Sequence, residues 1–158
     1  MILVSACLLN HPVRYKGDGN PCPLLMQYAD SPKLLAFCPE CAGGLPTPRP
    51  PAEIRGGTGA EIWSGQATLI NNQGVDVTAE FKSGAEQCLE LCQKHHITTA
   101  ILKQRSPSCG SKEIYDGTFS GTRIPGMGAT AALLAAHGIT IYGEEDITEE
   151  LLKKLLEE

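Results

Sequence analysis

Cysteine is the residue type in this chain with the greatest chemical potential. The sequence has seven cysteines among 158 residues. The opening segment 1–9 is apolar, but no basic stretch precedes it and no small-residue cleavage site closes it, so we expect no secretory leader. An odd cysteine count without a leader fits disulfides poorly and favours a reducing, cytoplasmic location. We therefore expect these cysteines to be core residues, nucleophiles or metal ligands.

Three of the cysteines each follow a short apolar segment typical of a buried strand. Cys7 and Cys38 come directly after such segments, and Cys109 lies in the polar loop after a third. Loops at the carboxyl ends of parallel strands leave from one edge of a sheet, so these thiols could converge there. Three thiolates suit an iron–sulfur cluster with one open iron, a Lewis acid with affinity for soft sulfur. Alternatively, each is a small buried residue at a strand end.

The close pair Cys38 and Cys41 invites two other interpretations. A thioredoxin-like site needs a helix that begins at Cys38, but the Pro- and Gly-rich stretch 42–51 predicts no early helix. A structural zinc site needs a second close pair. Cys88 and Cys92 are four residues apart, but they fall on the apolar face of a predicted helix, which indicates core packing.

The elements that must position these thiols alternate between strands and helices. Apolar periodicity and capping signals predict strands at Ile2–Ala6, Leu34–Phe37, Thr98–Leu102 and Ile139–Tyr142, and helices at Pro21–Ala29, Thr78–His95, Ala129–His137 and from Thr148 onward. Segments Ala67–Ile70 and Val75–Val77 predict a β-hairpin, and Pro39 to Gly59 is expected to be irregular. We therefore expect an α/β fold: a single Rossmann-like domain, 1–158, with a parallel sheet flanked by helices and a β-hairpin insertion.

Composition excludes some classes of function. The formal net charge is -5, so a general nucleic-acid binder is not expected. The apolar opening segment is far shorter than a membrane span, so no membrane association is expected. The oligomeric state leaves no signal in the sequence.

Six motifs resemble those of the thiouracil desulfidase family, formerly a domain of unknown function. The resemblance runs from Val4 to Glu145 and rests on Ser5-Ala-Cys7-Leu-Leu9, Arg14-Tyr15, Cys38-Pro-Glu40, Gly43-Gly-Leu-Pro-Thr-Pro-Arg49, Ser106-Pro-Ser-Cys-Gly110 and Thr122-Arg-Ile-Pro-Gly126.

The resemblance implies a [4Fe-4S] cluster held by Cys7, Cys38 and Cys109. It also implies an enzyme whose fourth iron takes the sulfur of a thiolated pyrimidine as hydrosulfide. Water supplies the replacing oxygen, so the net reaction is hydrolysis of a small thiouracil or 4-thiouridine type substrate. Family members commonly have glycine at the position of Asn10, and many have an aliphatic or polar residue at that of Cys41, whose extra thiol leaves alternative ligation open.

Replacing sulfur by oxygen also needs proton transfer. Glu40, two residues after Cys38, is the best placed general acid or base; its alternative is a loop carboxylate paired with an arginine. Ser106 and Ser108 flank Cys109 and either hold the pyrimidine, or the oxygen developing on it, or cap the loop.

Cationic and glycine residues in the predicted edge loops are candidates for substrate binding. Arg49, Lys103 and Arg123 could meet substrate oxygens or a phosphate, or remain solvated. Gly126 and Gly128 precede a predicted helix and could offer backbone N–H groups to an anion, or serve a tight turn.

The leading hypothesis is therefore an iron–sulfur-dependent desulfidase. The alternatives are a non-catalytic iron–sulfur or zinc-binding module, serving as a sensor or sulfur carrier, and a cofactor-free α/β domain that binds a small nucleotide. Cys22, which lies between two prolines, is either reactive or packed.

Overall fold

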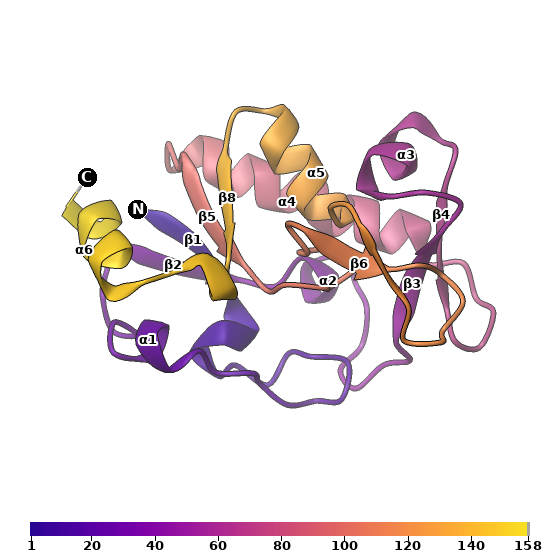
Figure 1. The fold of residues 1–158 in the computed structure, drawn as a ribbon, viewed down its shortest axis with the longest axis horizontal. Helices are drawn as coiled ribbons and strands as arrows, with labels where there is room; N and C mark the ends of the chain where they lie inside the picture. The colour runs from indigo at the N-terminus through magenta and orange to yellow at the C-terminus, as the bar shows by residue number, and fades with distance from the viewer. Residues whose placement is uncertain (158) are drawn as a thin grey trace.

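A parallel β-sheet forms the centre of the fold (Figure 1). The structure, a computed structural model, describes residues 1–157, so the last residue of the predicted domain lies outside the described part. The strand order is β2-β1-β5-β8, with β1 at Ile2–Ser5, β2 at Leu34–Phe37, β5 at Thr99–Leu102 and β8 at Thr140–Gly143. Each neighbouring pair is parallel, which confirms the predicted α/β sheet.

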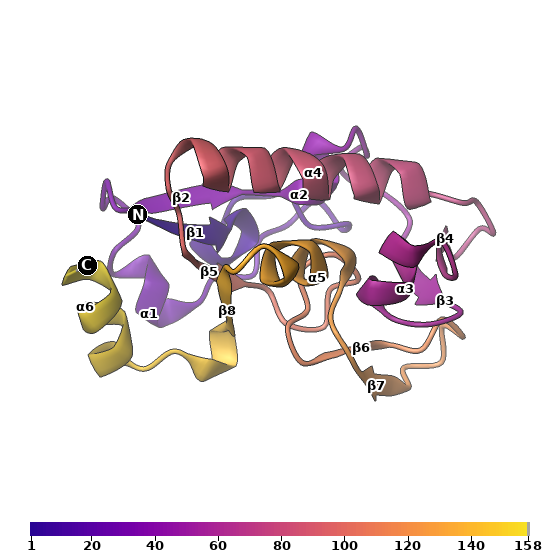
Figure 2. The same ribbon diagram turned by 90° about the horizontal axis from the view of Figure 1, so that it is seen from above.

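Helices cover both faces of this sheet, because its strands are apolar on both sides. Helices α4 (Thr78–Lys94) and α5 (Ala129–Ala136) pack against one face. Helices α1 (Pro23–Met26) and α6 (Glu149–Glu157), together with the 3-10 turn η1 (Ala6–Leu9), pack against the other. A second 3-10 turn, η2 (Glu144–Asp146), follows β8. Figure 2 shows this layering from above.

Two small antiparallel sheets lie beyond the carboxyl ends of the parallel strands (Figure 2). One pairs β3 (Ala52–Arg55) with β4 (Thr68–Asn71), and the other pairs β6 (Glu113–Tyr115) with β7 (Arg123–Pro125). Helix α3 (Gly59–Ser64) packs with them around a separate apolar cluster that includes Ile54, Ile62, Leu69, Phe81 and Ile114. These sheets stand beside the edge where the cysteine-bearing loops emerge.

The predicted hairpin is only partly correct. Residues 69–77 do turn back on themselves, with a bridge between Ile70 and Asp76. The main partner of β4, however, is β3, which lies in the stretch predicted to be irregular. This pairing joins segments distant in the chain, so local turn signals did not reveal it.

The expectation that no helix begins after Cys38 is wrong. Helix α2 (Pro39–Ala42) starts at once, with Cys38 as its N-cap and proline in its first turn, where no N–H is needed. Two glycines allow it to press against α4. A Cβ on Gly43 would lie 1.9 Å from the carbonyl oxygen of Glu80, and one on Gly84 would lie 1.8 Å from that of Pro39. Backbone packing therefore holds this one-turn helix in place.

Helix length also bears on membrane association. Among residues 1–157, no helix combines the length and the apolar character needed to traverse a bilayer.

Candidate active site

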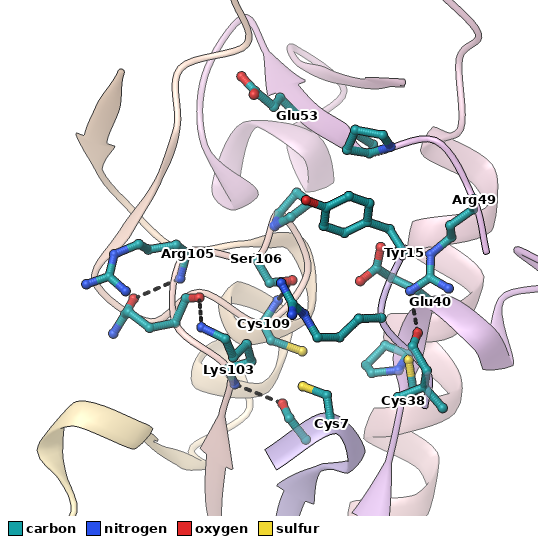
Figure 3. A pocket seen from close by; sticks show the side chains of 18 of the residues that line it. Cys7, Tyr15, Cys38, Glu40, Arg49, Glu53, Lys103, Arg105, Ser106 and Cys109 are labelled. Atoms are coloured by element: carbon teal, nitrogen blue, oxygen red, sulfur yellow. Dashed lines mark hydrogen bonds and ion pairs between the residues drawn. The ribbon is translucent and has the colours of Figure 1, made fainter. Parts of the chain in front are cut away.

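The three cysteines that follow strands border one cavity of about 500 Å³. Cys7 lies in η1 after β1, Cys38 follows β2 and caps α2, and Cys109 lies in the loop after β5. Figure 3 shows the sulfur atoms of Cys7 and Cys109 side by side, with that of Cys38 across the same space. The convergence predicted from the topology is therefore present, in a cavity of a size typical for small ligands.

Burial controls the protonation of these thiols. Desolvation raises the pKa of Cys7 to about 11, although the nearby ammonium of Lys103 opposes the rise. Desolvation also raises the pKa of Cys38 and of Cys109 to about 12 each. A negative charge on one thiol raises the pKa of another, as Cys38 does for Cys7 and Cys7 does for Cys109. Three thiolates therefore need added positive charge among them.

The arrangement of the side chains that could bind metal bears on whether the site holds a single ion or a larger cluster. Within residues 1–157, no three His, Cys, Asp or Glu side chains are close enough together to hold a single metal ion. The three thiols instead stand around a shared cavity.

The backbone around Cys7 is fixed by a tight turn. The carbonyl of Cys7 accepts hydrogen bonds from the N–H groups of Asn10 (3.0 Å) and Asn20 (2.9 Å). Asn10 has a φ of 66°, in the left-handed region that glycine and asparagine tolerate best. Asparagine at position 10, where the resemblance implies glycine, is therefore compatible with this turn.

The loop that carries Cys109, residues 103–110, is held by side chains and by a helix. The hydroxyl oxygen of Ser106 accepts hydrogen bonds from the N–H groups of Ser108 (3.1 Å) and Cys109 (3.0 Å). The first N–H groups of α5 donate to this loop, since Ala129 N lies 2.8 Å from Pro107 O. Ser106 therefore caps the loop, and it also borders the cavity.

Glu40 lies at the cavity wall beside a buried arginine (Figure 3). Its Oε1 is 3.5 Å from Nε of Arg49, and its side chain is 21% exposed. Burial raises the pKa of Glu40, and the charge of Arg49 opposes part of that rise. The arginine pairing expected as an alternative is thus present, and Glu40 also borders the cavity.

Arg49 is engaged mainly with the protein. Its guanidinium donates hydrogen bonds to the carbonyl of Val13 (2.8 Å) and to the hydroxyl of Thr47 (3.1 Å). Its backbone N–H donates to the carbonyl of Tyr15 (2.8 Å). Arg49 borders the cavity, but its donors tie the segment 13–15 to α2.

Three further cations border the cavity in ion pairs, of which Arg14 pairs with Asp18 at 3.4 Å. Lys103 lies 2.9 Å from Glu144, and Arg105 pairs with Glu145. Both carboxylates belong to η2, which follows β8. Lys103 was expected at the site from the sequence, and Arg105 was not.

Four predicted site residues are not among those that border the cavity. Ser108 is fully buried, with its hydroxyl 2.6 Å from that of Thr130. Arg123 is exposed on β7 and pairs with Glu113. Neither side chain therefore has the position at the cavity that the sequence predicted.

Gly126 and Gly128 also lie outside the cavity wall, and their N–H groups are already hydrogen-bonded within the protein. The N–H groups of Gly126 and Gly128 donate to the carbonyls of Lys112 (2.9 Å) and Gly110 (2.8 Å). A Cβ on Gly128 would lie 2.6 Å from Pro107 O, so this glycine serves close backbone packing instead of anion binding.

Sequence reasoning missed an acidic and aromatic part of the cavity wall. Glu53 of β3, Tyr115 of β6 and Phe119 of the following turn all border the cavity. A signal existed for Phe119, because an aromatic residue within Asp116-Gly-Thr-Phe-Ser-Gly121 is unusual among turn residues. Glu53 carried none, because its strand was not predicted.

The remaining cysteines do not border the cavity. Cys88 and Cys92 are fully buried in the core under α4, as predicted. Cys41 lies near the hydroxyl of Thr47 (3.4 Å), and Cys22 packs half-buried near α1. Within residues 1–157 every cysteine is a free thiol.

The chain is similar to known proteins along nearly its whole length. Residues 2–146 match the profile of a family described as 2-thiouracil desulfurase. The chain is 42% identical over 151 residues to the uncharacterized protein YbbK of Bacillus subtilis (strain 168), covering 96% of this chain and all of that protein. A solved structure described as the [4Fe-4S]-dependent thiouracil desulfidase TudS superposes with a TM-score of 0.84 at 48% identity, covering 98% of this chain and 97% of the other.

Proposed function

Because the chain belongs to the 2-thiouracil desulfurase family, we propose that it removes sulfur from a thiolated pyrimidine by hydrolysis, using a [4Fe-4S] cluster held by Cys7, Cys38 and Cys109. The observation that carries the proposal is the meeting of these thiols at one cavity that Glu40 also borders. The name of the TudS structure supports the cofactor and the thiouracil substrate.

The donor set fits such a cluster. Thiolates are the usual protein ligands of iron–sulfur clusters, and three of them leave one iron open. The raised pKa values of the free thiols mean that only strong positive charge would hold all three as thiolates near neutral pH. When bound, the cluster supplies a Lewis acid with affinity for sulfur.

The net reaction needs no electrons. The carbon–sulfur bond of the thiocarbonyl breaks and a carbon–oxygen bond forms. Water supplies the oxygen, and its two protons leave with the sulfur as hydrogen sulfide, or as hydrosulfide and a proton. A reaction of this kind needs a group that takes a proton from water and returns one.

We assign that proton transfer to Glu40. Its Oε1 is ion-paired with Arg49, so Oε2 is the oxygen assigned to the water. Burial raises the pKa of Glu40, which makes the carboxyl group a stronger base than an exposed glutamate and favours its taking a proton from water. Ser106, whose oxygen already accepts two N–H groups, has its hydroxyl hydrogen to donate to the pyrimidine.

The substrate is proposed to be a small molecule: a thiolated base, nucleoside or nucleotide. The net charge of -5 supports a small substrate over general nucleic-acid binding. Lys103 and Arg105 at the cavity wall are already ion-paired with carboxylates of η2.

We further propose that the protein acts in the cytoplasm and that its residues form one domain.

The test is purification without oxygen, followed by measurement of iron, sulfide and the visible spectrum. The protein should be brown and bind about three to four irons per chain. It should then convert 4-thiouracil to uracil, seen as loss of the thiocarbonyl absorbance with one sulfide released per turnover. Colourless protein that binds zinc would instead support a non-catalytic module.

Variants separate the proposed roles. Cys109→Ser should lose both colour and turnover, whereas Glu40→Gln should keep the colour and lose most turnover. Cys22→Ser is the matched control, because Cys22 does not border the cavity. Normal turnover by Glu40→Gln would refute the role assigned to this carboxyl group.

A further inference from the structure

The turn between β6 and β7, residues 116–122, forms part of the cavity wall. Phe119 and Gly121 of this turn border the cavity together with Tyr115 of β6. Phe119 has a φ of 56°, a left-handed conformation that is unfavourable for an aromatic residue. Such a conformation persists only where neighbouring groups hold it.

Glu53 holds the turn. Its Oε1 accepts hydrogen bonds from the N–H of Gly117 (2.9 Å) and from the N–H of Phe119 (3.2 Å). Hydrogen bonds from N–H groups to a carboxylate are stronger than those between neutral groups. Glu53 is therefore a two-point clamp on the residues that set the position of the Phe119 ring.

A second contact fixes the turn against the same strand. Gly117 has a φ of 91°, and a Cβ there would lie 2.6 Å from the carbonyl oxygen of Ile54. The side chain of Arg55 donates to the carbonyl of Gly117 at 3.4 Å. The turn therefore rests directly on the backbone of β3, the strand that carries Glu53.

These contacts point to a purpose beyond folding. Glu53 lies at the rim of the cavity away from the cysteines (Figure 3), and it borders the cavity itself. Its carboxylate accepts hydrogen bonds from two backbone N–H groups of the turn, those of the buried Gly117 and the half-buried Phe119, and so fixes Phe119 at the cavity wall. A flat aromatic wall is suited to stacking on a planar heterocycle.

We propose that Phe119 is a specificity-determining residue, against which the pyrimidine ring stacks, and that Glu53 is the positioning residue that holds it there. This inference rests on the proposed function, because the planar ring is that of the thiolated pyrimidine. It assigns to the β6–β7 turn the binding of the ring, separate from the sulfur and proton chemistry at the cysteines and Glu40.

The test combines kinetics and binding on the cluster-loaded protein. Phe119→Ala should raise KM for 4-thiouracil, and Kd for the product uracil, by about tenfold, as expected for loss of one stacking contact. Its kcat and iron content should stay within about twofold of wild type. Glu53→Ala should shift KM in the same direction, and Glu53→Gln, which keeps the Oε1 acceptor, should restore most of it.

Hydrogen exchange supplies a readout that does not depend on turnover. The amides of Gly117 and Phe119 should exchange at least about tenfold faster in Glu53→Ala than in wild type, and at nearly the wild-type rate in Glu53→Gln. Glu113→Gln is the matched control: this carboxylate lies on the same hairpin, pairs with Arg123 and does not border the cavity.

The outcomes separate the two proposals. Active wild-type protein whose KM and Kd are unaffected by Phe119→Ala would overturn this inference alone. Inactive wild-type protein that binds 4-thiouracil through Phe119 would overturn the proposed function and keep the inference. Protein that neither binds nor converts 4-thiouracil would overturn both. Equal exchange rates in Glu53→Ala and wild type would remove Glu53 as the clamp.

Discussion

The buried hydrogen bond between Ser108 and Thr130 offers a direct test of how the Cys109 loop is held. The two hydroxyl oxygens are 2.6 Å apart, and both residues are fully buried. Thr130→Val keeps the shape of the side chain but leaves the hydroxyl of Ser108 without this partner. The remaining partner of the Ser108 hydroxyl is then the sulfur of Cys109, a weak hydrogen-bonding group. We therefore expect a loss of about 1–2 kcal/mol and a fall in Tm of roughly 2–8 °C.

The double variant distinguishes pairing from simple loss of a side chain. Replacing both partners, as Ser108→Ala with Thr130→Val, removes both unpaired groups, so it should be less destabilising than the sum of the single variants. We expect a coupling free energy of about 1–2 kcal/mol. Urea unfolding of the four proteins under reducing conditions, with midpoint and slope compared, supplies the measurement.

The same variants test the chemistry. Since Ser108 does not border the cavity, Ser108→Ala at equal iron content should turn over 4-thiouracil within about twofold of wild type. A hundredfold loss of turnover with unchanged stability would refute this reasoning and return Ser108 to the substrate-binding role that the sequence predicted.

Three further predictions follow from other contacts. Gly128→Ala should destabilise the protein by about 1–3 kcal/mol and lower its iron content, because a Cβ would collide with the backbone of the Cys109 loop; unchanged thermal unfolding and iron analysis would contradict this. Arg49→Lys should lower the free energy of unfolding, measured with urea, by about 3 kcal/mol, because an ammonium cannot replace the several donors of the guanidinium beside Glu40. A loss below about 0.5 kcal/mol would argue against the role of Arg49 in holding these segments together. Hydrogen bonding by the side chain of Thr78, and then by its N–H, lowers the pKa of Asp76 below the ordinary 3.8. The stabilisation from this carboxylate is therefore present above that pH and is lost as the pH falls through the lowered value. Asp76→Asn should be less stable than wild type at about pH 7, and the difference between their urea midpoints should shrink as the pH falls below 3.8.

The convergence of the thiols was predictable because it follows from topology. Apolar segments before Cys7, Cys38 and Cys109 predicted strands, and parallel strands send their following loops to one edge. No local detail was needed, since the rule depends only on strand direction. The four strands of the parallel sheet were themselves predictable, because each is an uninterrupted apolar run in the sequence.

What the sequence did not reveal depends on contacts between distant segments. Helix α2 is a single turn and owes its place to α4, a contact that no local pattern encodes. Strand β3 pairs with β4 across the intervening helix α3, so Glu53 had no predicted position. Gly128 was ambiguous in principle, because an anion site and a close backbone contact both require the absence of a side chain.

The glycine contact between α2 and α4 has a consequence for redesign of this protein. Gly43 and Gly84 do not border the cavity, yet their close backbone contact sets the position of α2, the helix that has Cys38 as its N-cap and carries Glu40. A mutagenesis library aimed at new thiolated substrates can vary the Phe119 side chain, but any side chain at position 43 or 84 would collide with backbone atoms. A side chain at either position would push α2 away from α4. It would thereby displace Cys38, the proposed cluster ligand, together with Glu40, the proposed acid and base.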